Sequence, residues 1–298
     1  MAKSKITLGG TEALLAAAFF FAITNVLVRE MATMWGDQAQ VAARFALVWV
    51  LLAGYALFAR KKVSIPRSKI PIAVAYSIGA AVAILFFTLS LQATSIANTL
   101  FTSNAVELFV GFLLGTIILK ESVTRRKIIA IALALVGLAF YADSLLSGNL
   151  GIIFGLLAGV MVGVCNLLAK QLKGVDLNAI LRMQFGVGAI FMFGLTFLFS
   201  GGDIVRTVSI EGAVVTLIFA LVLIIATRLV LYGLQHSDVN VASVVLSSQL
   251  AMGAVLGFLF FREVPAAHEI ISGVLVTAAA IVAGTGRKPS LKDIPTHS

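Results

Sequence analysis

Residues 91–121 read LQATSIANTLFTSNAVELFVGFLLGTIILKE, and residues 234–263 read LQHSDVNVASVVLSSQLAMGAVLGFLFFRE. Both stretches begin with Leu-Gln, pass through a serine-containing turn, continue as an apolar helix and end with a basic residue followed by glutamate. In this alignment Glu107 lies opposite Gln249, and Glu121 lies opposite Glu263. Polar landmarks in the same order indicate an internal duplication, because apolar helices that are alike by chance would not share them.

The duplication extends beyond these two stretches. ITNVLVRE at 23–30 resembles VCNLLAKQ at 164–171, which pairs Asn25 with Asn166. Arg44 and Arg182 occupy matching places further along. We therefore expect one repeat over residues 11–146, a second over 150–286 and a short tail over 287–298.

The composition predicts a membrane protein. The 298 residues are 60% hydrophobic and 12% charged, with a mean hydropathy of +1.07, whereas soluble domains carry about 25% charged residues. A helix crosses the hydrocarbon core with about 20 apolar residues. The expected fold is therefore an all-α integral membrane protein with ten spans. We place them near 11–33, 39–59, 70–92, 97–119, 127–146, 150–170, 178–199, 211–235, 241–262 and 268–286. Few prolines fall within a span, so most helices should be unbroken.

Five spans per repeat is an odd number, so the second repeat should enter the membrane from the opposite side. The basic residues agree with this inversion. The loop after the second span carries Arg60, Lys61, Lys62, Arg67 and Lys69, whereas its counterpart after the seventh span carries Arg206 alone. Because basic loops stay in the cytoplasm, both termini are expected there. The net charge of +9 comes from such short runs, so no nucleic-acid partner is expected.

An inverted repeat favours transport. Two halves related by an axis in the membrane plane can exchange conformations, which closes one side and opens the other around a site at the midplane. The alternatives are a membrane enzyme or a pore. An enzyme would need a polar catalytic cluster, and a pore would need a continuous polar stripe, and the sequence shows neither.

The segments Leu91–Glu121 and Leu234–Glu263, with the duplicated order around them, resemble the EamA-type members of the drug/metabolite transporter superfamily. Over about the whole chain the sequence is most similar to bacterial exporters of aromatic amino acids. The resemblance implies export of small amphipathic metabolites across the bacterial inner membrane. Another metabolite, a sugar derivative or a drug cation would share the same features. Family members often have a proline within the fourth and ninth helices, and this chain has none there.

Glu107 is the main candidate residue. It lies roughly 15 Å from the start of its span at about 1.5 Å per residue, near the bilayer centre, where ionisable groups are costly and usually functional. It could carry a coupling proton, contact a substrate amine or pair structurally with Arg228. Arg228 could bind a substrate carboxylate or extend to the inner surface. Arg44 and Arg182 lie close to span ends, and we interpret both as extending to the surface or structural.

The remaining candidates are polar or aromatic residues within spans. Asn25 and Asn166 could bind a zwitterion or join two helices. Other side chains of the fourth and ninth spans could line a cavity, and these are Ser103, Asn104, Ser247, Ser248 and Gln249. Aromatic residues that could form an apolar wall are Tyr76, Phe86, Trp49 and Tyr232.

The sequence shows no sign of a cofactor or of catalysis. It contains no G-x-x-x-x-G-K-[ST] motif, so ATP is not expected as the energy source. His236, His268 and His297 are scattered and predict no metal site. The expected partners are a small-molecule substrate, the lipid bilayer and protons as a coupling ion. Because ten helices can enclose a cavity alone, we expect a functional monomer.

Overall fold

The computed structural model describes residues 9–58, 64–94, 96–140, 150–199, 201–262 and 267–284. Its α-helices are α1 Gly10–Met31, α2 Asp37–Phe58, α3 Ile70–Ala93, α4 Ile96–Ile117, α5 Arg125–Ala139, α6 Leu150–Gln171, α7 Leu177–Phe199, α8 Ile210–His236, α9 Val239–Leu246, α10 Gln249–Phe261 and α11 Ala267–Gly284. A short 3-10 helix, η1, covers Arg67–Lys69. Three parts of the sequence-based predictions lie outside the described residues. They are the basic residues at 60–62, Glu263 and the tail over 287–298.

Eight helical segments of the described chain are long and apolar enough to cross a membrane, counting α9 and α10 as one. They are the segments from α1 to α4, from α6 to α8, and the α9–α10 pair. Helix α5 has 15 residues, which span about 22 Å at about 1.5 Å per residue and so fall short of a core of about 30 Å. The last part of the fifth expected span, 141–146, lies outside the described residues.

The ninth expected span is interrupted, although most of the helices were expected to be unbroken. Helix α9 ends at Leu246 and α10 begins at Gln249. At the junction the Ser248 amide bonds to the Val245 carbonyl at 3.1 Å, three residues back. The Ser247 hydroxyl donates to the Ser243 carbonyl at 2.8 Å. Serine hydroxyls that bond back to the helix backbone bend helices, so serine disturbs this span where proline is absent.

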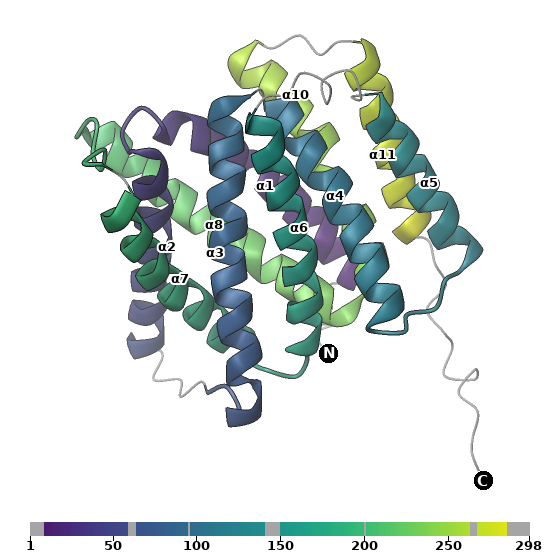
Figure 1. Ribbon diagram of the computed structural model, residues 1–298, viewed down its shortest axis with the longest axis horizontal. Helices are drawn as coiled ribbons and strands as arrows, with labels where there is room; N and C mark the ends of the chain where they lie inside the picture. The colour runs from purple at the N-terminus through teal and green to yellow at the C-terminus, as the bar shows by residue number, and fades with distance from the viewer. Residues whose placement is uncertain are drawn as a thin grey trace, which may run out of the picture.

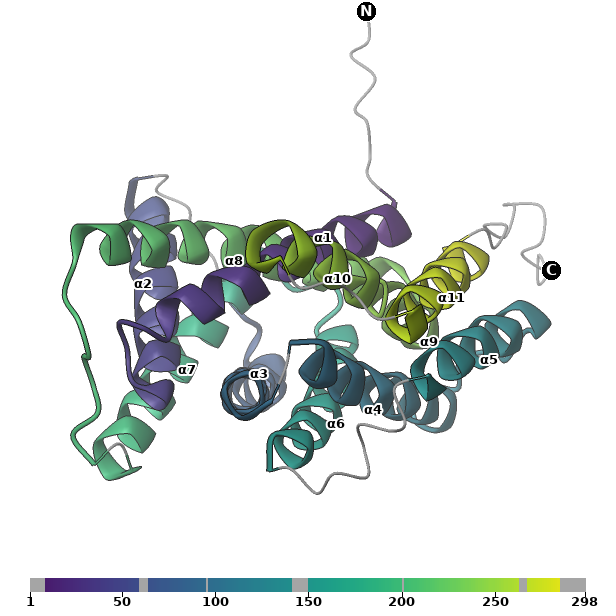
Figure 2. The ribbon, with the colours of Figure 1, turned by 90° about the horizontal axis from the view of Figure 1, so that it is seen from above.

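The central helices form two facing layers (Figure 2). Helices α1, α8 and α10 make one layer, and α3, α4 and α6 make the other, with α1 against α8 and α6 against α3 and α4. At the two ends of the molecule α2 packs on α7 and α5 packs on α11 (Figure 1). The pairing is reciprocal, because α1 meets α8 as its repeat counterpart α6 meets α3.

Glycine allows α6 to lie unusually close to α4. A Cβ on Gly159 would fall 2.3 Å from the Ser103 carbonyl oxygen, and one on Gly155 would fall 2.0 Å from the Thr102 hydroxyl. Small residues spaced four apart let two helix backbones approach in lipid. The glycines of α6 at positions 155 and 159 therefore serve close helix packing.

Hydrogen bonds from basic side chains of one repeat to backbone carbonyls at helix ends of the other connect the two repeats. Arg206, between α7 and α8, donates to the Ala32 carbonyl just after α1 at 2.9 Å. On the other repeat Lys69, before α3, donates to the Gln171 carbonyl at the end of α6 at 2.7 Å. We call these two contacts the carbonyl tethers. They lie in corresponding places of the two repeats.

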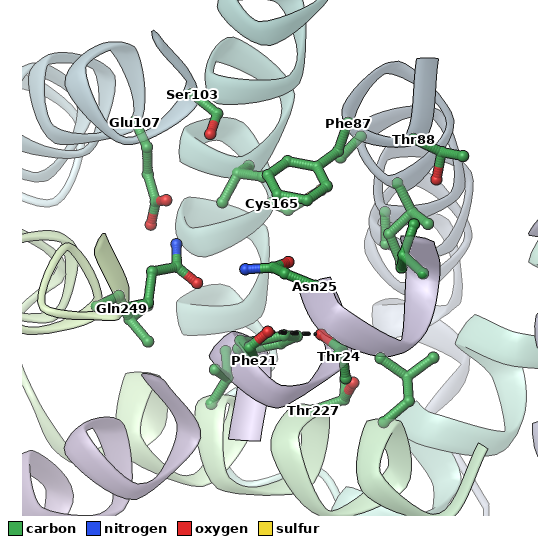
Figure 3. A pocket seen from close by; sticks show the side chains of 18 of the residues that line it. Phe21, Thr24, Asn25, Phe87, Thr88, Ser103, Glu107, Cys165, Thr227 and Gln249 are labelled. Carbon is green, nitrogen blue, oxygen red and sulfur yellow. Dashed lines mark hydrogen bonds between the residues drawn. The ribbon is translucent and has the colours of Figure 1, made fainter. Parts of the chain in front are cut away.

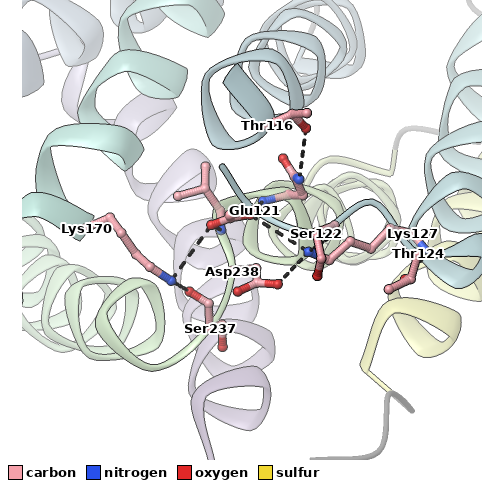
Figure 4. Close-up of polar contacts among 10 residues, drawn as sticks. Thr116, Glu121, Ser122, Thr124, Lys127, Lys170, Ser237 and Asp238 are labelled. Atoms are coloured by element: carbon pink, nitrogen blue, oxygen red, sulfur yellow. Dashed lines mark hydrogen bonds and ion pairs between the residues drawn. The ribbon is translucent and has the colours of Figure 1, made fainter. Parts of the chain in front are cut away.

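A cluster of charged residues joins α4, α5, α6 and the start of α9 (Figure 4). The Glu121 carboxylate accepts from the amides of Val239 and Asn240 at 2.7 and 3.2 Å, where the helix dipole favours a negative charge. Lys127 lies 2.5 Å from Asp238 and 4.0 Å from Glu121. Lys170 lies 3.9 Å from Glu121. This charge cluster connects the two layers of helices at one end of the interface between them.

Candidate functional site

A cavity of about 180 Å³ lies between the two layers (Figure 3). Its lining comes from α1, α3, α4, α6, α8 and the α9–α10 pair, with one residue each from α2 and α7. An apolar cavity of about 150 Å³ holds a benzene molecule. The volume therefore suits a solute the size of one aromatic ring with a small polar group.

The lining residues correspond between the repeats. The alignment of Leu91 with Leu234 places Tyr76 opposite Phe219, Ile84 opposite Thr227 and Phe87 opposite Val230, and all six line the cavity. Asn25 with Asn166, and Glu107 with Gln249, are two further lining pairs. The cavity thus lies where the two repeats face each other.

One side of the cavity is polar and built around Glu107, which is 4% exposed. The Asn166 amide donates to its carboxylate at 2.9 Å. Arg228 donates to Asn178 instead, so the structure does not contain the alternative in which Glu107 pairs with Arg228. Gln249 and Asn25 also face this space (Figure 3). The Gln249 amide donates to Asn104 at 2.8 Å, which connects α10 to α4. These groups offer hydrogen bonds and one acidic side chain to a solute.

Arg44 supplies the basic group of the cavity. Its side chain is buried, with 1% exposure, and its guanidinium donates to Gln40 and, at 3.3 Å, to Thr88. The guanidinium carbon also lies 4.6 Å from the ring centre of Phe219. Of the two roles expected for Arg44, extension to the membrane surface is therefore wrong. Helix α2 turns this residue toward the bundle interior.

Aromatic and aliphatic side chains complete the walls. Tyr76 and Phe219 are buried, and Phe21 and Phe87 join them in the lining. The lone cysteine, Cys165, lines the same space and is 7% exposed. Within the described ranges no group of three or more His, Cys, Asp or Glu side chains could hold a metal ion.

The structure brings six of the predicted site residues to the cavity, and they are Asn25, Tyr76, Ser103, Glu107, Asn166 and Gln249. The other four lie outside the lining. Phe86 stacks on Phe154 with ring centres 6.1 Å apart, and the Asn104 amide donates to the Leu100 carbonyl at 2.6 Å. Ser247 bonds within its own helix.

Arg228 is the fourth residue outside the cavity. Its side chain is exposed and donates to Asn178 at 3.0 Å, near the start of α7. Thr227, the residue before it, faces the cavity instead. A long basic side chain directed along the outside of the bundle matches the alternative in which Arg228 extends to a membrane surface.

Several lining residues were not predicted, and they include Arg44, Thr88, Gln184 and Phe87. Arg44 carried a detectable signal, because Gln40 precedes it by one helical turn and can accept from it on the same face. Thr88 and Gln184 are single polar residues in apolar helices, which are common and uninformative alone.

Residues 9–142 and 149–285 each match the model of the EamA-like transporter family. The chain belongs to the EamA-like transporter family. Its two matched segments show that the duplication is a pair of EamA units. As an EamA protein, the chain is a multi-pass membrane transporter of small solutes.

The fold is also found among solved structures. A crystal structure described only as that of a protein superposes on 94% of this EamA protein and 99% of its own chain, with a TM-score of 0.76 and 14% identity. This likeness concerns the fold alone. No curated protein matches the chain.

Proposed function

We propose that this EamA protein is a secondary transporter that exports aromatic or other hydrophobic amino acids by alternating access. The observation that carries the proposal is the cavity between two repeat-related layers, lined by equivalent residues from both. In an inverted repeat, exchange of the two conformations opens such a site first to one side and then to the other.

The proposed topology has ten spans as a 5+5 inverted repeat. Helices α5 and α11 act as the fifth and tenth spans, and α9 with α10 forms the ninth. The reciprocal packing of α1 on α8 and of α6 on α3 supports the inversion. The basic loops support cytoplasmic termini, and the family resemblance supports the bacterial inner membrane.

The cavity chemistry supports an amphipathic solute. Glu107 can receive an ammonium group, with Asn25 and Gln249 beside it. Tyr76, Phe21 and Phe87 provide an apolar surface for a ring or a branched side chain. An organic cation would use the same carboxylate and the same rings, and it is the second candidate substrate.

Glu107 is the proposed coupling residue. A carboxyl that faces a cavity opening alternately to each side can take up a proton on one side and release it on the other. A substrate ammonium that contacts the ionised carboxylate would compete with that proton, which gives exchange of substrate for proton. The alternative is facilitated transport, in which the substrate moves down its own concentration gradient and Glu107 exchanges no proton.

Reconstitution in liposomes tests the proposal. We expect counterflow of labelled phenylalanine that unlabelled phenylalanine or tyrosine reduces, and we expect a pH gradient to change its rate. Glu107→Gln should abolish the effect of the pH gradient. Glu211→Gln, at an exposed position in the first turn of α8, is the matched control and should retain it.

Three results would contradict the proposal in whole or in part. Absence of counterflow for every amino acid would remove the substrate assignment, and flux of an organic cation alone would favour the second candidate. An unchanged pH effect in Glu107→Gln would remove the coupling role while leaving transport intact.

A further inference from the structure

We propose that Arg44 forms a binding site for a carboxylate group of the solute at the side of the cavity away from Glu107. This inference deepens the proposed function, on which it rests, by assigning the acidic group of the substrate to a named residue. It predicts that the transporter distinguishes carboxylates from amines of the same shape.

The first argument is an uncompensated charge. Arg44 is almost fully buried, yet it forms no ion pair with any residue in the described part of the chain. Gln40 and Thr88 give it neutral partners, and Phe219 gives a cation–π contact. Buried charges are normally paired, because an unpaired charge away from water is costly. A solute carboxylate would supply the missing anion.

The second argument comes from unpaired polar atoms around the same space. The Nε of Arg44 and the Nδ2 of Asn25 are buried donors without an acceptor in the structure. Both residues line the cavity, and Asn25 is 5% exposed. Buried donors are almost always paired, so an acceptor-rich ligand is indicated. A carboxylate offers two oxygens, and a guanidinium can bind both with parallel hydrogen bonds.

The third argument is the separation of charge. Thr88, a hydrogen-bond partner of Arg44, and Glu107 lie at opposite sides of the cavity (Figure 3). Glu107 is engaged with Asn166, not with Arg44. An acid at one side and a base at the other offer each charge of a zwitterion a partner of opposite sign, and the aromatic lining residues offer contacts to its side chain.

The experiment compares three probes of similar size, namely phenylalanine, 3-phenylpropionate and phenethylamine. Binding is measured on purified protein in nanodiscs by thermal stabilisation, which does not depend on transport. Arg44→Gln should weaken binding of both carboxylates about tenfold or more and leave phenethylamine binding within about twofold. Arg44→Lys should weaken carboxylate binding by an intermediate amount and leave phenethylamine binding unaffected. Lysine keeps the positive charge but lacks the planar guanidinium that binds both carboxylate oxygens.

Arg182→Gln is the matched control, because Arg182 is the arginine of α7, near the start of that helix, and does not line the cavity. It should bind all three probes like the unmodified protein. If Arg44→Gln fails to fold, Arg44→Lys decides the question by the same comparison.

The outcomes separate this inference from the proposed function. Equal loss of all three probes, or no loss, would overturn the role of Arg44 even if phenylalanine is transported. Failure of any carboxylate to stabilise the unmodified protein would overturn it as well. Binding of 3-phenylpropionate that depends on Arg44, without phenylalanine transport, would support Arg44 and reject the amino-acid assignment.

Discussion

The side-chain amide of Asn166 donates a hydrogen bond of 2.9 Å to the carboxylate of Glu107. The bond joins α6 to α4 at the cavity. The repeat counterpart of Asn166, Asn25, lies in the same lining, and its amide nitrogen has no acceptor in the structure. Two asparagines in equivalent positions therefore have different energetic roles in this conformation.

Asn166→Ala should lower the free energy of unfolding by about 0.6 to 1.7 kcal/mol, which are the mean and the maximum found for hydrogen bonds between membrane helices. Asn25→Ala removes no hydrogen bond of the Nδ2 atom and should cost less. Denaturation in graded detergent mixtures measures both. Equal losses for the two variants would show that the contact to Glu107 adds no stability.

Gly159→Ala should destabilise the protein by about 1–3 kcal/mol, because overpacking forces a shift of neighbouring atoms. The clashing group is the Ser103 carbonyl, 2.3 Å away, and backbone cannot rotate aside as a side chain can. Gly194 in α7 has open space around it. Gly194→Ala is the control and should be neutral or gain up to about 1 kcal/mol in helix propensity.

Glu121→Ala should loosen the charge cluster and expose the cavity from that side. Each hydrogen bond to a charged group contributes about 1.5–3 kcal/mol, so loss of these contacts should raise the open population about fivefold or more. Cys165 is the single cysteine and lines the cavity. The rate of its reaction with a polar maleimide reports the opening, and no cysteine has to be introduced. Glu211→Ala should leave that rate unchanged.

The tether at Arg206 should respond to acid. Hydrogen bonding from Arg206 holds the pKa of the Asp203 carboxyl below its ordinary value. The contribution of this hydrogen bond to folding stability is fully present above the ordinary pKa of aspartate. It is lost as the pH falls through the lowered pKa of Asp203. Thermal unfolding between neutral and acidic pH should therefore show a smaller acid-dependent decrease in Asp203→Asn than in the unmodified protein.

The positions of most helices follow from sequence alone, because a bilayer requires long apolar helices and short connections. The predicted start near 70 agrees with α3 at Ile70, and the predicted end near 199 agrees with α7 at Phe199. The interruption between α9 and α10 was missed, since it depends on where serine hydroxyls find an acceptor. The apolar composition of a span does not predict which acceptor a serine hydroxyl binds.

The site was predicted less closely, and the errors have one physical form. Phe86, Asn104, Arg228 and Ser247 were predicted to face the cavity, yet each lies next to a residue that does, namely Phe87, Ser103, Thr227 and Leu246. One residue is a rotation of about 100° around a helix of about 3.6 residues per turn. In helices that are apolar on all sides, no periodicity fixes that rotation. Tertiary packing sets it.

The carbonyl tethers have a consequence for how the chain could be divided. Each one anchors the end of a helix in one repeat to a connecting segment of the other, through Arg206 and Lys69. A single repeat produced alone would lack the donor for its own helix end and would present the polar cavity wall to lipid. We therefore expect that neither half folds independently, and that halves encoded on separate genes accumulate only when they are synthesised together.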